Sequence, residues 1–158
     1  MKSLPVLVLA SALSCAVPGV AAASSSPWAD VQGGAVRLVT SGEPDADGIL
    51  LGALQIDLKP GWKTYWRDPG DTGVPPAISL TGATLAGVAY PVPQRFDEGG
   101  TVWNGYEAPV SFAIRLKMPD GKAEQIEARV FLGICQTICI PLQAELKLDP
   151  GADPKNPG

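Results

Sequence analysis

The chain has 158 residues, with 12 Lys and Arg against 16 Asp and Glu, so its formal net charge is −4. This mild acidity, without any run of basic residues, excludes the phosphate-binding surface that nucleic-acid-binding proteins use. The sequence contains no histidine, which excludes Ser/His and Cys/His catalytic pairs and most transition-metal sites.

The first 23 residues have the pattern of a secretory signal peptide. A basic start precedes an apolar run, Leu4 to Ala16, that is too short to span a bilayer, and Ala21–Ala23 offers a small-residue cleavage site. The alternative is a lipoprotein signal acylated at Cys15, but a leucine lies one position too close to that cysteine for the usual motif. We therefore expect an exported protein.

After the signal, the pattern predicts one domain over residues 24–150 and a Pro/Gly-rich tail at 151–158. No later segment is long and apolar enough to cross a membrane, so we expect no direct membrane insertion after signal cleavage. The segment from Ser24 to Asp30 reads as a loosely held polar leader. No stretch of ten or more residues shows the apolar period of a helix.

Short strands separated by Gly/Pro turns follow instead. Alternating apolar and polar residues, or short apolar runs, predict strands over 35–39, 54–59, 62–66, 77–80, 85–90, 110–117, 126–132 and 142–148. Residues 67–76 read as a proline-stiffened loop, and residues 91–100 as a second loop with an aromatic tip. Seven or eight short strands favour an all-β fold, with an immunoglobulin-like β-sandwich as the best interpretation.

Two cysteines remain once the signal is removed, an even number for an oxidising compartment. The apolar residues of 126–132 and 142–148 are even-numbered, whereas Cys135 and Cys139 are odd. The cysteines therefore share the outward face, provided that Gly133 introduces no bulge. A three-residue loop would place them opposite each other with Cα atoms about 4.5 to 5.5 Å apart, which a disulfide accepts.

Two interpretations of this pair stay open. A structural staple is one, although closing a loop of five residues contributes only about 2 kcal/mol. The other is a redox pair, because short exposed disulfides are those that thiolates attack. A zinc or copper site is disfavoured, since two thiolates without histidine are too few ligands. We expect no cofactor and no bound metal.

Groups that activate the sulfurs must come from residues distant in the sequence, because no Lys or Arg lies within five residues of either cysteine. Aromatic side chains from two loops are candidates for a cap over the sulfurs, and nearby aspartates for proton handling. They are Trp62, Tyr65, Trp66, Phe96 and Trp103, with Asp68, Asp71 and Asp97. The competing interpretation is that the aromatics pack in the core or in turns and that the aspartates cap turns.

Three motifs in fixed order resemble a known family. They are Gly61–Pro76 (GWKTYWRDPGDTGVPP), Tyr90–Phe96 (YPVPQRF) and Cys135–Pro141 (CQTICIP). Together they resemble the N-terminal periplasmic domain of the thiol:disulfide interchange protein DsbD, and in particular its ScsB-like relatives, which are linked to copper tolerance. The resemblance covers essentially the whole chain after the signal.

The resemblance implies a periplasmic immunoglobulin-like domain that takes part in electron transfer. Its cysteine pair would receive electrons from a membrane-embedded redox donor protein and pass them to periplasmic thioredoxin-like proteins. By position in the motif, Cys139 would form the mixed disulfide and Cys135 would resolve it. The three-residue spacing is shorter than in the best-known DsbD domains. The sequence carries neither the transmembrane nor the thioredoxin-like domain, so we expect a separate subunit, a fragment, or a protein that has lost the relay.

Two further functions remain as alternatives. One is a non-catalytic exported binding module that uses Trp62, Trp66 and Trp103 on a glycan or a protein, with an inert disulfide. The other is a copper-tolerance accessory protein holding Cu(I) on its two thiolates, which the lack of histidine and the scarcity of methionine disfavour.

Overall fold

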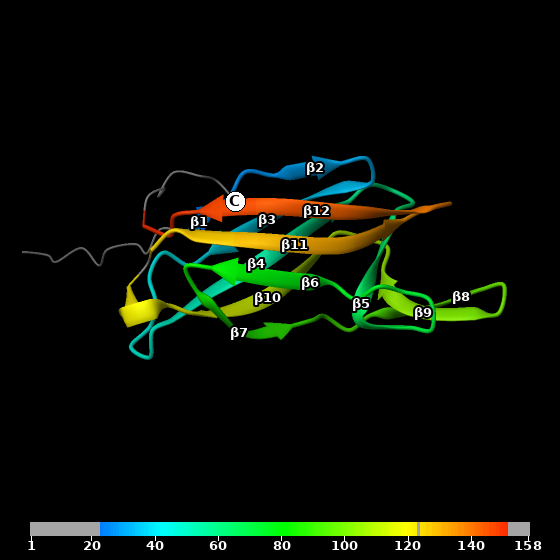
Figure 1. Cartoon of the computed structure of the whole chain (residues 1–158). Helices are drawn as coiled ribbons and strands as arrows, with labels where there is room; N and C mark the ends of the chain where they lie inside the picture. Colours follow the sequence, from blue (N-terminus) through cyan, green and yellow to red (C-terminus); the bar gives the residue numbers. More distant parts are fainter. Residues whose placement is uncertain (1–22, 123, 152–158) are drawn as a thin grey trace, which may run out of the picture.

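The computed structural model describes residues 23–122 and 124–151 of the chain. The predicted signal peptide, including Cys15, and the predicted tail lie outside these ranges except for residues 23 and 151. Within them the chain forms twelve strands and one short 3-10 helix, η1 (Pro119–Gly121). The strands build two antiparallel sheets that face each other (Figure 1).

The first sheet has the strand order β1-β3-β4-β10-β7, and β2 also pairs with β3. Its strands are β1 (Ser24–Ser25), β2 (Ala29–Val31), β3 (Gly34–Thr40), β4 (Ile49–Leu58), β7 (Thr84–Ala89) and β10 (Val110–Lys117). The second sheet has the order β12-β11-β5-β9-β8, and β6 also pairs with β11. Its strands are β5 (Lys63–Gly70), β6 (Ala77–Thr81), β8 (Gln94–Glu98), β9 (Thr101–Tyr106), β11 (Ile126–Cys135) and β12 (Cys139–Leu148).

The core lies between the two sheets and follows the alternation that the sequence predicts. In β10 every second side chain is buried, and Phe112, Ile114 and Leu116 are almost inaccessible to solvent. The even-numbered residues of β11, such as Leu132, meet them from the other sheet. Each such side chain contributes about 1.5 to 3 kcal/mol through burial. The prediction of an all-β sandwich is confirmed.

The prediction of a loose leader over Ser24–Asp30 is wrong. Ser24 and Ser26 are buried, and the backbone N–H of Leu38 donates to Ser26 Oγ over 3.0 Å. Ser24 Oγ donates to the carbonyl oxygen of Pro150, also over 3.0 Å. Hydroxyl side chains thus satisfy backbone groups at the edge of the sheet. Strands of two and three residues are too short to show an apolar period.

The loop predicted over residues 91–100 is also wrong in part, because Gln94–Glu98 is strand β8. It forms a hairpin with β9 that projects at one end of the sandwich (Figure 1). Most of β8 is exposed, so no alternation of buried and polar residues marks it in the sequence. Strand β5 continues to Gly70 beyond its predicted end, with an irregularity in its pairing to β9 between Tyr65 and Gly70.

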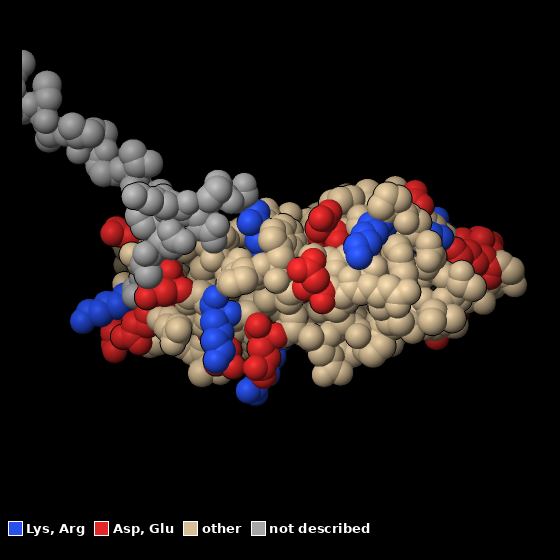
Figure 2. All heavy atoms as spheres, turned by 90° about the horizontal axis from the view of Figure 1, so that it is seen from above, with Lys and Arg blue, Asp and Glu red and all other residues tan. Residues whose placement is uncertain are grey.

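Charged side chains are distributed over both sheets. On the face shown in Figure 2, Lys and Arg alternate with Asp and Glu and form no extended patch of one sign. Among the described residues, Arg129 pairs with Glu127 and Glu145, and Lys147 pairs with Glu127. These ion pairs lie on the outward side of the β11–β12 hairpin. The hairpin therefore has the two cysteines at its tip and paired charges of opposite sign farther along its strands.

Candidate functional site

The β11–β12 hairpin pairs without a shift from Ile126 opposite Leu148 to Cys135 opposite Cys139. Gly133 pairs with Pro141 in the same register, so it introduces no bulge. Cys135 and Cys139 form a disulfide with an S–S distance of 2.02 Å. Since Ile134 is fully buried in the core, its odd-numbered neighbour Cys135 faces outward, in agreement with the parity of the sequence.

The two Cα atoms are 3.9 Å apart, which is closer than the sequence-based range of about 4.5 to 5.5 Å. A three-residue turn and the covalent bond draw the strands together here. Within the turn, the backbone N–H of Gln136 donates to the carbonyl oxygen of Ile138 over 3.0 Å. Ile138 itself is exposed at the tip.

The two cysteines differ in accessibility. Cys135 is only 8% exposed, whereas Cys139 is an exposed residue. The cause is their place in the sheet, because β11 lies between β12 and β5, while β12 is the outermost strand. Cys135 is paired on both sides, with Cys139 and with Lys63. A protein that approaches the disulfide from solvent therefore meets Cys139 first.

Tyr65 of β5 covers the disulfide. Its Oη lies 3.4 Å from Sγ of each cysteine, and since a disulfide sulfur carries no hydrogen, the hydroxyl is the donor. The ring rests on Gly133, where an added Cβ would lie 3.0 Å from Cδ2 and 3.1 Å from Cε2. A Cβ added at Gly73 would likewise lie 2.8 Å from Cδ1 on the other edge of the ring. Burial, and secondarily the negative charge of Glu98, raises the pKa of Tyr65, which keeps the hydroxyl protonated.

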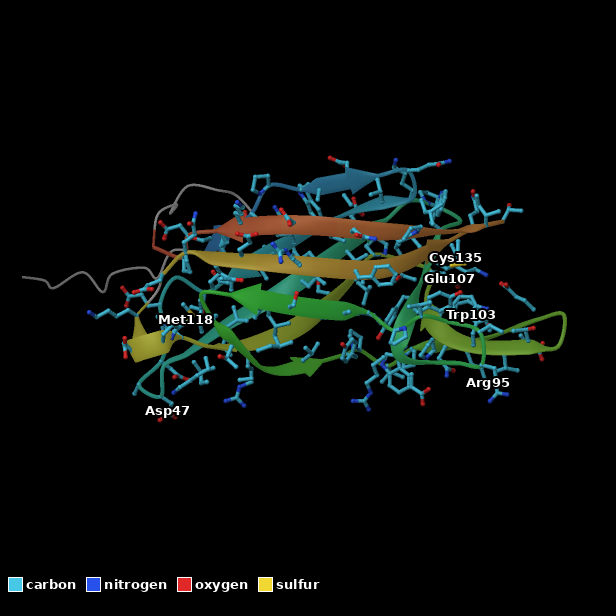
Figure 3. All side chains as sticks on the ribbon, viewed as in Figure 1. Asp47, Arg95, Trp103, Glu107, Met118 and Cys135 are labelled. Carbon is cyan, nitrogen blue, oxygen red and sulfur yellow. A yellow bond between two sulfur atoms is a disulfide. The ribbon has the colours of Figure 1, made fainter. Side chains whose placement is uncertain are left out.

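The β8–β9 hairpin supports Tyr65 from behind with two aromatic rings. Trp103 meets the Tyr65 ring edge-on, with centroids 5.4 Å apart, and Phe96 stacks on Trp103 at 4.1 Å. Trp103 is buried. Figure 3 places Trp103 and Cys135 at the same end of the sandwich, opposite Met118. Three of the residues named from the sequence therefore form one group over the disulfide.

Lys63 is a neighbour of the disulfide that the sequence reasoning missed. It is the direct cross-strand partner of Cys135. Its Nζ lies 2.5 Å from Glu98 Oε1, 4.7 Å from the centroid of Phe96 and 5.4 Å from that of Trp103. The hydrogen bond from Lys63 is the main cause that lowers the pKa of Glu98. The available signal was the position of Lys63 two residues before Tyr65, on the same face of one strand.

Two of the tryptophans named from the sequence lie elsewhere. Trp62 belongs to the core, where its ring packs against Gly33 beside Ile134. Trp66 is half-buried against the same core, with Arg67 over its ring at 4.9 Å. Neither ring is part of the group over the disulfide that Tyr65, Phe96 and Trp103 form.

The three aspartates are exposed and do not meet the sulfurs within the described residues. The carbonyl oxygen of Asp68 accepts a hydrogen bond from the Asn104 amide, but its carboxylate has no partner in residues 23–122 and 124–151. The same holds for the side chain of Asp71 in these ranges. Asp97 Oδ1 accepts from the backbone N–H of Gly100 over 3.2 Å, which closes the β8–β9 turn. Proton handling by these residues stays a prediction.

The described part of the chain offers no group of three His, Cys, Asp or Glu side chains that could hold a metal ion. It also contains no helix whose length and hydropathy suit a membrane span.

Comparison with known proteins agrees with this geometry. Residues 40–150 match the family described as thiol:disulfide interchange protein DsbD, N-terminal. The chain belongs to this family. Among solved structures it is similar to the N-terminal periplasmic domain of ScsB from Proteus mirabilis, with 30% sequence identity and a TM-score of 0.67 over 80% of this chain. No curated protein matches the sequence.

The chain spans about half of that ScsB domain, 51% of its length. The resemblance to DsbD and ScsB predicted from the three motifs is confirmed, and so is the immunoglobulin-like fold. The matched range, residues 40–150, contains the Cys135–Cys139 disulfide.

Proposed function

We propose that this protein is a periplasmic thiol–disulfide interchange module that passes electrons through Cys135 and Cys139. The observation that carries the proposal is the unequal accessibility of the two cysteines, with Cys139 open to a partner and Cys135 covered. Exchange requires one reachable sulfur and one that leaves or resolves. Export follows from the predicted signal peptide, and the similar ScsB domain is itself periplasmic.

In the reductive half of the cycle, a thiolate of a dithiol donor attacks Cys139 Sγ. The bond between the two sulfurs breaks, its electron pair stays on Cys135 Sγ, and the donor is held to Cys139 as a mixed disulfide. The donor's second thiolate then attacks the donor sulfur and releases Cys139. The donor ends as a disulfide and this domain as a dithiol, so two electrons have moved. A membrane-embedded redox protein is the proposed donor.

In the oxidative half, the Cys139 thiolate attacks the disulfide of a thioredoxin-like acceptor. Cys135 then attacks Cys139 Sγ, which re-forms the internal disulfide and releases the acceptor as a dithiol. In this proposal Tyr65 acts in both halves, because its protonated hydroxyl lies 3.4 Å from each sulfur and can donate to either one when it carries charge. In this role the chain is the protein-disulfide reductase component that hands electrons outward.

The test uses the two single-cysteine variants and an acceptor with one reactive sulfur. A thioredoxin-like protein lacking its resolving cysteine is activated as a mixed disulfide with thionitrobenzoate, whose release is followed by absorbance. We expect Cys135→Ser, which keeps Cys139, to form a stable mixed disulfide at least about ten times faster than Cys139→Ser. Equal rates, or no adduct with either variant, would rule out exchange through Cys139 and leave the structural staple.

A further inference from the structure

Lys63 is the basic residue that the fold brings to the disulfide. Strand β5 pairs with the end of β11 so that Lys63 lies opposite Cys135. Residues opposite each other in an antiparallel pair project to the same face, with Cβ atoms about 4.5 to 5.5 Å apart. Other cations on the β11–β12 hairpin, Arg129 and Lys147, lie toward its far end in ion pairs. The positive charge beside Cys135 therefore comes from β5.

The Lys63 ammonium is held rather than free. Glu98 at the end of β8 pairs with it, and the rings of Phe96 and Trp103 lie under it. Its side chain is only 25% exposed, so solvent screens its charge less than that of a surface lysine. The same two rings support Tyr65, so the charge and the covering hydroxyl belong to one packed group.

We propose that Lys63 stabilises Cys135 as a thiolate and thereby makes Cys139 the sulfur that a partner attacks. This inference rests on the proposed function. When a donor thiolate attacks Cys139 Sγ, the electron pair of the broken bond goes to the sulfur that leaves as the better-stabilised thiolate. A cation beside Cys135 favours that outcome over attack on Cys135 with Cys139 leaving. Lys63 is thus a positioning residue that decides which of the two sulfurs the partner attacks.

Glu98 limits the effect. While the pair is oxidised, the carboxylate neutralises much of the Lys63 charge. Once Cys135 is a thiolate, the two anions share one ammonium. Among the described residues, the titratable neighbours of Cys135 are Tyr65, whose hydroxyl contacts its sulfur, and Lys63, its cross-strand partner. Glu98 of β8 in turn pairs with Lys63. An unshared cation within about 4 to 6 Å of an acidic group lowers its pKa by about 1 to 3 units, so with Glu98 sharing the Lys63 ammonium we expect a lowering of about one unit for the Cys135 thiol.

The experiment measures the pKa of the Cys135 thiol in a Cys139→Ser background, from the ultraviolet absorbance of the thiolate against pH. We expect Lys63→Met to raise this pKa by about one unit, a tenfold loss of thiolate below the pKa. Lys63→Arg should restore the lower value. Glu98→Gln should shift the pKa downward, because Lys63 then serves Cys135 alone. Lys147→Met, on the same hairpin, is the matched control and should change nothing.

The opposite signs expected for Lys63→Met and Glu98→Gln separate an electrostatic role from a folding defect, which would move both in one direction. An unchanged pKa in Lys63→Met, or an equal rise in Lys63→Arg, would overturn the inference. If the Cys135→Ser variant with Lys63 intact forms no mixed disulfide, the proposed function itself has failed. Normal exchange by the unaltered chain with no response to Lys63→Met refutes the Lys63 inference alone.

Discussion

Gly133 makes room for the ring that covers the disulfide, and replacing it with alanine should loosen that cover. A Cβ at this position would lie 3.0 and 3.1 Å from two atoms of Tyr65, whereas carbon atoms pack well at about 3.5 to 4.0 Å. The ring must therefore retreat by about 0.5 Å. Trp103 meets the ring edge-on, with centroids 5.4 Å apart, and limits its movement on one side.

The cost follows from two opposing terms. Forced overpacking costs about 1 to 3 kcal/mol, and alanine in place of glycine returns about 0.4 to 1 kcal/mol by restricting the unfolded chain. We expect Gly133→Ala to lose about 1 to 2 kcal/mol of unfolding free energy with the disulfide intact. The displaced ring also meets more water, so the pKa of Tyr65, which burial raises, should fall toward its ordinary value.

Urea unfolding measures the first effect, and absorbance titration against a Tyr65→Phe background measures the second. Gly87→Ala is the matched control, because a Cβ at Gly87 in β7 would meet no atom within 4 Å. It should leave stability unchanged or slightly higher. If Gly133→Ala behaves like Gly87→Ala in both assays, the Tyr65 ring does not pack against Gly133 of β11.

Two further predictions concern the disulfide and a buried phenol. Reducing the Cys135–Cys139 disulfide opens a loop of only five residues, so the domain should stay folded and lose about 2 kcal/mol of unfolding free energy. Urea unfolding should show a lower midpoint with an unchanged slope. Unfolding of the domain on reduction would contradict this expectation. Burial, then the charge of Tyr90, raises the pKa of Tyr106 to about 12, and the charge of Arg67 acts weakly against this. Because the folded pKa lies above the ordinary value of 10.0, this stabilisation is complete below pH 10 and is lost as the pH rises through about 12. Tyr106→Phe should remove that alkaline dependence of the unfolding free energy, and a variant that keeps it would show that another group is responsible.

The sequence predicted the hairpin tip well, because strand parity is a local property. The even-numbered apolar residues on both strands continue without interruption to Ile134, so the outward face of Cys135 and Cys139 could be read from the sequence alone. Strands with one buried face were found for the same reason. The edge strands β1, β2 and β8 were missed, since short or exposed strands need no alternation. Strand β9 was missed as well, because its buried and half-buried residues do not alternate regularly with exposed ones.

The surroundings of the disulfide were predicted only in part. Tyr65 and Trp103 were named as candidates because they are aromatic, but so was Trp62, which the fold turns into the core instead. The difference is one of register, since only the pairing of β5 with β11 decides which residues of β5 face the sulfurs. That pairing joins residues far apart in the chain. For the same reason Lys63 could not be found by a search near the cysteines in sequence.

The reduction potential of the Cys135–Cys139 pair tests the central claim most directly. It can be measured by equilibrating the folded domain with dithiothreitol and glutathione buffers and trapping free thiols. Structural disulfides of exported proteins lie below about −300 mV, whereas pairs that exchange with protein partners lie higher. We predict a midpoint above about −300 mV, with the folded domain cycling reversibly between its two forms. A midpoint well below that value would contradict the account and make the disulfide a structural staple.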